Sequence, residues 1–235
     1  MENKLIFLDN SLLNNVHAIR VNVFGAGGTG SHLMLHLARI HYALKLMGRK
    51  GLQVSLVDID VVRESSPARA MIAPCTIGES KSTSVISSIN ITYGTNWRAF
   101  NGTEDLPKNC DFLITCTDTV LSRKLILEQF KDCYIYHIDI GNSSESGQIV
   151  MGRKSGKKGV KKIPGIFDLH KKLKDEDVRH SCSIFDSLST QGLFINSLAA
   201  QLCGQMIFEF LEKRNLNYHG FYFNINNGWA KIPIK

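Results

Sequence analysis

Short apolar runs alternate with longer amphipathic stretches along the first 140 residues. The apolar runs predict strands near residues 21–24, 52–58, 111–116 and 133–140. The amphipathic stretches predict helices near residues 31–47, 80–91 and 119–131. Several runs are continuously apolar, which is typical of strands covered by helices on both faces. The alternation predicts an α/β fold: a doubly wound, Rossmann-like, mostly parallel sheet with helices on both faces.

The last third of the chain predicts a different ending. Residues 147–150 read as a short strand, residues 190–211 as a long apolar helix, and residues 221–234 as two strands around the turn Asn226-Asn227-Gly228. We therefore expect a C-terminal β-hairpin. At 235 residues and 43% hydrophobic content, the chain is long enough for one α/β domain with a sizeable core, so we expect a single domain over residues 1–235.

A glycine-rich turn stands where the first strand gives way to the first long helix. Gly25, Gly27 and Gly30 fit the G-x-G-x-x-G pattern, with Gly28 between them. Such a turn brings backbone close to phosphates and aims the N–H groups of the helix start at their charge. Asp58, at the end of the next strand, can accept hydrogen bonds from ribose hydroxyls. These features predict a nucleotide site and serve NAD and ATP equally well.

The residues after Asp58 distinguish between NAD and ATP as the expected ligand. The segment from Asp58 to Arg69 and the later Gly78-Glu79-Ser80-Lys81 resemble the D-x-D-x-V-x-x-S-N-L-x-R-Q and G-x-x-K pattern of the ThiF/MoeB and ubiquitin-activating-enzyme superfamily. Cys116-Thr117-Asp118-Thr119 with Arg123 resembles the D-N-x-x-x-R segment of the same superfamily. Within it, the chain is most similar to the ThiF-related protein of PRTRC cassettes.

This resemblance implies Mg·ATP-dependent adenylation of the C-terminal carboxylate of a small ubiquitin-like (β-grasp) or sulfur-carrier protein, by a homodimer. It implies that Arg69 clamps the triphosphate, that Lys81 lies near the phosphates, and that Asp118 holds Mg²⁺. Asp58 would bind ribose, and Asp60 would fix the loop. Ser66 would contact the phosphates in place of the usual Asn, and Ala70 replaces the usual Gln, so both leave full activity open.

Each of these roles has a simpler alternative. Arg69 and Lys81 are also consistent with ordinary surface cations, and Asp118 with the N-cap of the following helix, a position that Asp favours. Arg123, one turn later, fits either the helix surface or a pair with Asp118.

The positive charge is concentrated in one segment. The formal net charge is +7, and residues 153–174 hold nine Lys or Arg against Asp168 alone. Glycines break this segment, so we expect a flexible crossover loop over residues 152–181 that a substrate tail would pass beneath. The alternative partner for this loop is a nucleic acid such as tRNA, which we consider the weaker interpretation.

Six scattered cysteines form no C-x-x-C pair, so neither a zinc site nor a disulfide framework is indicated. Ser181-Cys182-Ser183 resembles the stretch around the thioester cysteine of some ubiquitin-like activating enzymes, which makes Cys182 a candidate nucleophile beside His180 or Arg179. No apolar run is long enough to span a membrane, and we expect a cytoplasmic protein.

Two other functions stay open at this point. An NAD(P)-dependent oxidoreductase would use the glycine turn and Asp58, but it leaves Arg69, Lys81 and Asp118 without a purpose. A non-catalytic nucleotide-binding scaffold is favoured by Ser66 and Ala70.

Overall fold

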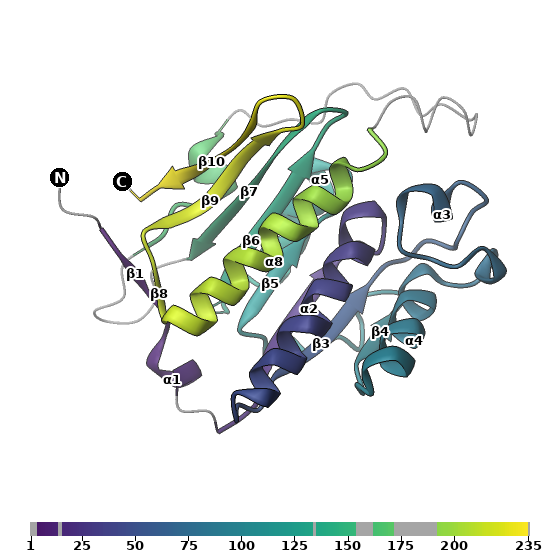
Figure 1. The fold of residues 1–235 in the computed structure, drawn as a ribbon, viewed down its shortest axis with the longest axis horizontal. Helices are drawn as coiled ribbons and strands as arrows, with labels where there is room; N and C mark the ends of the chain where they lie inside the picture. Colours follow the sequence, from purple (N-terminus) through teal and green to yellow (C-terminus); the bar gives the residue numbers. More distant parts are fainter. Residues whose placement is uncertain (1–3, 14–15, 134, 154–161, 172–191, 235) are drawn as a thin grey trace.

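The structure is a computed structural model that describes residues 4–13, 16–133, 135–153, 162–171 and 192–234. Its centre is an eight-stranded sheet with the order β10-β9-β7-β6-β5-β2-β3-β4 (Figure 1). These strands are β2 (Ile19–Phe24), β3 (Leu52–Val57), β4 (Arg98–Phe100), β5 (Phe112–Thr115), β6 (Tyr136–Asn142), β7 (Ser146–Arg153), β9 (Tyr218–Asn224) and β10 (Gly228–Pro233). A separate two-stranded sheet joins β1 (Ile6–Phe7) to β8 (Asn215–Leu216).

The five strands from β4 to β6 are parallel, and β7, β9 and β10 continue the sheet in antiparallel fashion. Strand β2 lies between β3 and β5, and its last residue, Phe24, is paired with both Val57 and Thr115. The chain winds outward from β2 to β3 and β4, and then returns to β5 on the other side of β2. The carboxyl ends of β2 and β5 therefore form the topological switch point, where open α/β sheets bind their ligands.

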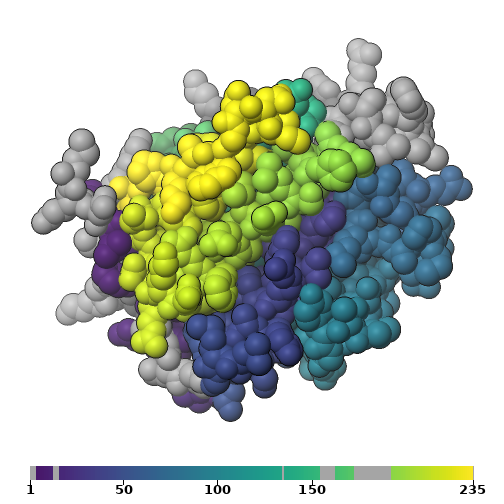
Figure 2. All heavy atoms as spheres, in the orientation of Figure 1, coloured from purple at the N-terminus to yellow at the C-terminus, as the bar shows by residue number. Residues whose placement is uncertain are grey.

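Helices cover both faces of the sheet. On one face lie α2 (Gly28–Leu46), α4 (Lys81–Tyr93) and α8 (Ile195–Lys213). On the other lie α5 (Val120–Gln129) and the short α6 (Ile166–Leu169). Helices α2 and α8 run side by side and begin at the same end of the sheet (Figure 1), and both are visible in Figure 2, with α4 on the other side of α2. Three short helical segments, α1 (Asn10–Leu13), α3 (Ser66–Arg69) and the 3-10 turn η1 (Pro74–Thr76), lie in loops.

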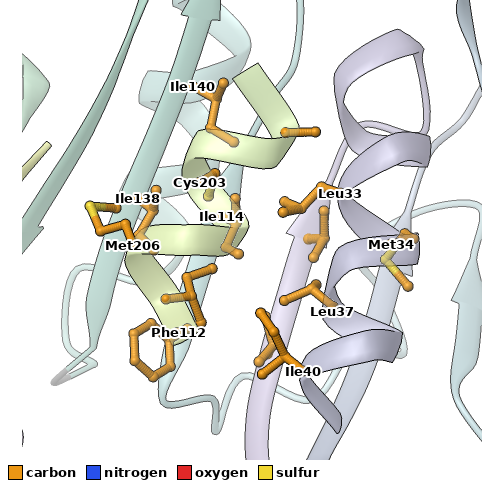
Figure 3. Close-up of a cluster of buried hydrophobic side chains, with 14 of the residues drawn as sticks. Leu33, Met34, Leu37, Ile40, Phe112, Ile114, Ile138, Ile140, Cys203 and Met206 are labelled. Atoms are coloured by element: carbon orange, nitrogen blue, oxygen red, sulfur yellow. The ribbon is translucent and has the colours of Figure 1, made fainter. Parts of the chain in front are cut away.

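The main core lies between the sheet and the helices α2 and α8. Leu33 and Leu37 on α2 are fully buried, because their spacing places both on one side of the helix. They point toward the strand residue Ile114 and toward α8, whose Cys203 and Met206 belong to the same core, with Met206 lying beside Ile138 (Figure 3). Fully burying a side chain of this size contributes about 1.5–3 kcal/mol. This packing fixes where both helices begin.

A second core lies under α5. Phe24 and Leu113 point to this face and pack with Ile126 and Phe130, and the Phe24 and Phe130 rings meet edge to face at 6.0 Å. Because neighbouring strand residues point to opposite faces, Val23 contributes to the first core and Phe24 to the second. The prediction of continuously apolar strands with helices on both faces is confirmed.

The predicted elements agree with the structure to within a few residues at their ends, and the terminal hairpin β9–β10 is present. The basic segment begins later than expected, because Gly152 and Arg153 belong to β7. Residues 162–171 are described and packed: Ile163 pairs with Arg153, and Ile166 is fully buried. The remaining residues of the predicted crossover loop, 154–161 and 172–181, lie outside the described part, so that loop stays a prediction. Within the described ranges, no helix is long and apolar enough to cross a membrane.

Candidate nucleotide site

The glycine-rich turn joins β2 to α2 at the switch point, and two of its glycines lie so close to backbone carbonyl oxygens that a side chain has no room. Gly25 has a φ of +100°, and a Cβ added there would lie 2.7 Å from the carbonyl oxygen of Cys116, just after β5. A Cβ on Gly30 would lie 1.7 Å from the carbonyl oxygen of Gly25. Glycine at these positions lets the two strand ends and the first turn of α2 come close together.

Gly27 faces the other way. It is the N-cap of α2, it has an ordinary φ of −72°, and a Cβ there would have no atom within 4 Å. The first backbone amides of a helix have no acceptor within the helix. In α2, the N–H of Ser31 already donates to the Gly27 carbonyl at 3.0 Å, so the free amides are those that precede it. The open side of Gly27 therefore exposes the positive end of a 19-residue helix, where a phosphate binds favourably.

Asp58 lies directly against this turn. Its Oδ2 accepts from the Ala26 N–H at 2.6 Å, and its Oδ1 accepts from the Asp60 N–H at 2.8 Å. The half-buried carboxylate is thereby fixed beside the turn, with acceptor capacity left for ribose hydroxyls.

Lys81 and Asp60 form an ion pair at the edge of the site. The Lys81 Nζ lies 2.8 Å from Asp60 Oδ2, and the Lys81 N–H donates to the Asp60 carbonyl at 3.0 Å. The lysine side chain is 15% exposed and the aspartate side chain 48%, so the ammonium group is much better shielded than its partner. Asp60 thus holds Lys81 at the start of α4, which agrees with the loop-fixing role expected of Asp60.

The segment containing Ser66 and Arg69 is docked on the first turn of α2. Ser31 Oγ accepts from the Met71 N–H at 2.8 Å. Burial lowers the pKa of His32, and a hydrogen bond with the backbone of Arg69 opposes that shift. Ser66 Oγ accepts from the Arg63 N–H at 3.0 Å, so it is engaged within its own loop. The backbone of Arg69 consequently lies beside the glycine turn.

Asp118 follows β5, across the switch point from Asp58. It is exposed, and its carboxylate forms no hydrogen bond or ion pair with the residues that the structure describes. The alternative that Asp118 caps α5 is wrong, because Thr119 is the N-cap and its Oγ1 accepts from the Ser122 N–H at 3.1 Å. An exposed carboxylate at this position is available to a cation.

The geometry brings the glycine turn, Asp58, the Lys81–Asp60 pair and Asp118 to one end of the sheet. Residues 2–234 match the sequence profile of the ThiF family. The chain belongs to the ThiF family. No curated protein sequence matches the chain. The likeness to the PRTRC-type protein within this family stays a prediction.

Solved structures show the same fold at low sequence identity. The Microcin C7 biosynthetic enzyme MccB in complex with N-formylated MccA is 14% identical, has a TM-score of 0.66, and is matched over 95% of this chain and 67% of its own. PaaA is 16% identical, with a TM-score of 0.63 over 94% and 66% of the two chains. E. coli MccB with ATP is 13% identical, with a TM-score of 0.64 over 95% and 66%. The chain thus spans about two thirds of the length of these proteins.

Membership of the ThiF family supports ATP-dependent adenylation of a substrate carboxylate as the class of reaction. The residues fit Mg²⁺ when the phosphates of a bound nucleotide and water supply the remaining ligands. Within the described ranges, no group of three or more His, Cys, Asp or Glu side chains could hold a metal ion by itself. Mg²⁺ is commonly bound by one or two carboxylates together with substrate phosphates and water. Asp118 fits that arrangement as the protein ligand.

Arg123 of the ThiF-family motif is neither on the surface nor paired with Asp118. It is buried, its Nε donates to the Thr117 carbonyl at 3.0 Å, and its Nη1 lies 3.4 Å from the fully buried Asp139. Thr115 Oγ1 donates to Asp139 at 2.8 Å and lies 2.9 Å from His137 Nε2. This buried polar group sits under the end of β5 and holds the backbone just before Asp118.

Sequence reasoning missed two residues beside the turn, Asn142 and Asn196. Asn142 ends β6, and Asn196 lies in the first turn of α8 with 4% of its surface exposed. Both contact Thr29 of α2: its Oγ1 lies 2.9 Å from Asn196 Oδ1 and 3.2 Å from Asn142 Oδ1. A polar side chain on the buried side of the apolar α8 pattern was the signal that could have found Asn196.

The described cysteines near the turn are structural. Burial raises the pKa of the Cys116 and Cys203 thiols well above the ordinary range, so neither is a thiolate at neutral pH. Cys182, the candidate nucleophile, lies outside the described residues.

Proposed function

We propose that this ThiF-family protein uses Mg·ATP to adenylate the C-terminal carboxylate of a small ubiquitin-like or sulfur-carrier protein. One observation carries the proposal: a shielded cation, Lys81, and a carboxylate that no described residue engages, Asp118, flank a glycine turn and a ribose-type aspartate. A dehydrogenase that binds NAD needs the turn and the aspartate alone. A nucleotide whose phosphates react needs cations where charge accumulates.

The proposed reaction assigns a task to each part of the site. The first amides of α2 and the Lys81 ammonium hold the phosphates, Arg69 clamps them, and Asp58 orients the ribose. Mg²⁺ held by Asp118 and the phosphates would neutralise charge on the departing pyrophosphate. The substrate carboxylate oxygen attacks the α-phosphorus, a C–O–P linkage forms, and the bond from the α-phosphorus to the pyrophosphate oxygen breaks.

A polypeptide substrate is supported indirectly by the fold shared with MccB, which has solved structures with ATP and with MccA. The β-grasp partner, the homodimer and the cytoplasmic location belong to the same proposal. A second step at Cys182 is also part of it: the thiolate attacks the acyl carbon, a thioester forms, and AMP leaves with the former acyl–phosphate oxygen.

ATP–pyrophosphate exchange tests the proposal. With Mg·ATP, labelled pyrophosphate and a small ubiquitin-like protein ending in a free carboxylate, label should enter ATP. Removing the C-terminal residues of the partner should abolish the exchange, and a partner blocked as an amide is the matched control. Exchange that ignores the state of this carboxylate would refute it, as would thermal stabilisation by NAD with none by Mg·ATP.

A non-catalytic nucleotide-binding scaffold is the second candidate. The observation that favours it is Ser66, whose Oγ is engaged by the Arg63 N–H inside its own loop instead of offering an amide donor to a phosphate. Stabilisation by Mg·ATP without any exchange, in the presence of a genuine partner, would select this candidate.

A further inference from the structure

A buried asparagine lies over the start of α2, and nothing in the motif of the family points to it. The Cβ position of Gly28, the first residue of α2, lies 2.5 Å from Asn196 Nδ2. The amide group of Asn196 therefore takes the space that a side chain on Gly28 would occupy. Asn196 comes from α8, which begins at the same end of the sheet as α2 (Figure 1).

The oxygen of this amide is fixed by two neighbours. Asn196 Oδ1 lies 2.9 Å from Thr29 Oγ1 and accepts from Asn142 Nδ2 at 3.1 Å. Because this atom accepts a hydrogen bond from an amide nitrogen, it is the oxygen of the Asn196 amide, and the nitrogen of that amide faces Gly28. The three side chains belong to α2, β6 and α8, so the amide is anchored from three elements and cannot easily rotate.

The nitrogen of the same amide keeps its donors available. Asn196 is 96% buried, since 4% of its surface is exposed, yet its Nδ2 donates to no group in the part of the chain that the structure describes. Among the described side chains, the buried atoms without a hydrogen-bond partner are Thr117 Oγ1 and Arg153 Nε, so the Asn196 Nδ2 is accessible at the surface, where a ligand can accept from it. The N-terminal end of α2 favours an anion, because the free amides and the positive end of the helix dipole lie there.

We propose that Asn196 is a nucleotide-binding residue, whose Nδ2 donates a hydrogen bond to a phosphate oxygen lying over Gly27 and Gly28. This inference rests on the proposed nucleotide function of the site. It deepens that function by adding a neutral amide donor from α8 to the amides of α2. Such a donor contributes to phosphate binding and contributes nothing to binding of the nucleoside.

Calorimetric titration with Mg·ATP and with adenosine tests this role. Asn196→Ala should weaken ATP binding about tenfold or more, as expected for one hydrogen bond to a charged group, and leave adenosine binding unchanged. Asn22→Ala is the matched control: Asn22 is 3% exposed and donates to the Pro107 carbonyl at 2.8 Å, on the other side of the sheet from α2. It should lose stability without losing ATP affinity.

A second variant guards against misfolding. Asn196→Asp keeps an oxygen for Thr29 and Asn142 and replaces the donor with an anionic oxygen, so ATP binding should fall further while adenosine still binds. Wild-type ATP affinity in Asn196→Ala, or equal losses for ATP and adenosine, would overturn this inference alone. A wild-type protein that binds no ATP would overturn the proposed function as well.

Discussion

Replacing Gly27 by alanine should separate nucleotide binding from folding. The Cβ of an alanine at this position meets no atom within 4 Å, and the φ of −72° suits any residue. The protein should therefore accept the methyl group without strain. The space it fills is the space through which a phosphate would approach the first amides of α2, so the methyl group should hold the phosphate away from at least one of them.

The magnitude follows from the hydrogen bond that the methyl group would prevent. A hydrogen bond to a charged group contributes about 1.5–3 kcal/mol, so its absence should weaken ATP binding roughly ten- to hundredfold. The cost to stability should be small, because alanine is a poorer N-cap than glycine by several tenths of a kcal/mol, about what the stiffer unfolded chain restores. The melting temperature without ligand should therefore shift by no more than about 2–4 °C.

Gly165→Ala is the matched control. Gly165 is also an N-cap in extended conformation, it opens α6 on the opposite face of the sheet, and its nearest neighbour would lie 3.8 Å from the new Cβ. Isothermal titration with Mg·ATP should show reduced affinity for Gly27→Ala and unchanged affinity for Gly165→Ala. If Gly27→Ala binds ATP like the wild type, the phosphates do not lie over this turn, and the reasoning is refuted.

Asp118→Asn should leave the melting temperature without ligand unchanged and make stabilisation by Mg·ATP equal to that by ATP with a chelator; a persistent Mg²⁺ effect would contradict its metal role. Lys81→Met should weaken ATP binding about tenfold but cost at most about 1 kcal/mol of unfolding free energy in a denaturant titration, because a partly exposed pair contributes little. Arg123→Met should cost about 3–5 kcal/mol in the same titration, because Asp139 would be left buried without its cation; a loss below about 1 kcal/mol would contradict this. Burial lowers the pKa of His36, so the unfolded chain binds more protons, and unfolding free energy should fall as pH drops below the ordinary value near 6.5; His36→Gln should flatten that slope.

The parallel sheet and the glycine turn were predictable because their signals are local. A strand buried on both faces must be apolar at consecutive positions, and β5, with all four residues buried, shows this directly in its sequence. Only glycine fits position 30, where a Cβ would lie 1.7 Å from a carbonyl oxygen, so the spacing of the glycines alone reveals this close approach.

The short elements could not be predicted, since two or three residues are too few for a pattern of burial to appear in the sequence. Strand β4 has three residues, and its first, Arg98, is exposed, so no apolar run announces it. The two-residue strands β1 and β8 pair over more than 200 residues of sequence, and only the folded chain brings them together. Local sequence carries no information on such pairings.

The partners of the site residues were unpredictable for a similar reason. Lys81 meets Asp60 across a loop of about twenty residues, and Asn196 reaches Thr29 from the far end of the chain. Arg123 occupies a helix position that the sequence alone could equally assign to the surface. Its true partner, Asp139, lies on the next strand, and only the pairing of β5 with β6 determines that contact.

The switch point is flanked by two groups of buried polar side chains, one around Asn196 and one around Arg123. Both lie at the carboxyl ends of strands, where apolar packing stops and loops must still be held in place. The first group fixes the start of α2, and the second fixes the backbone before Asp118. Since a phosphate at the turn and a cation at Asp118 must meet, their distance has to be set before ligand binds. Substitutions of residues whose side chains face only the ligand should therefore leave stability unchanged. Substitutions within the Arg123 group should reduce stability and nucleotide affinity together.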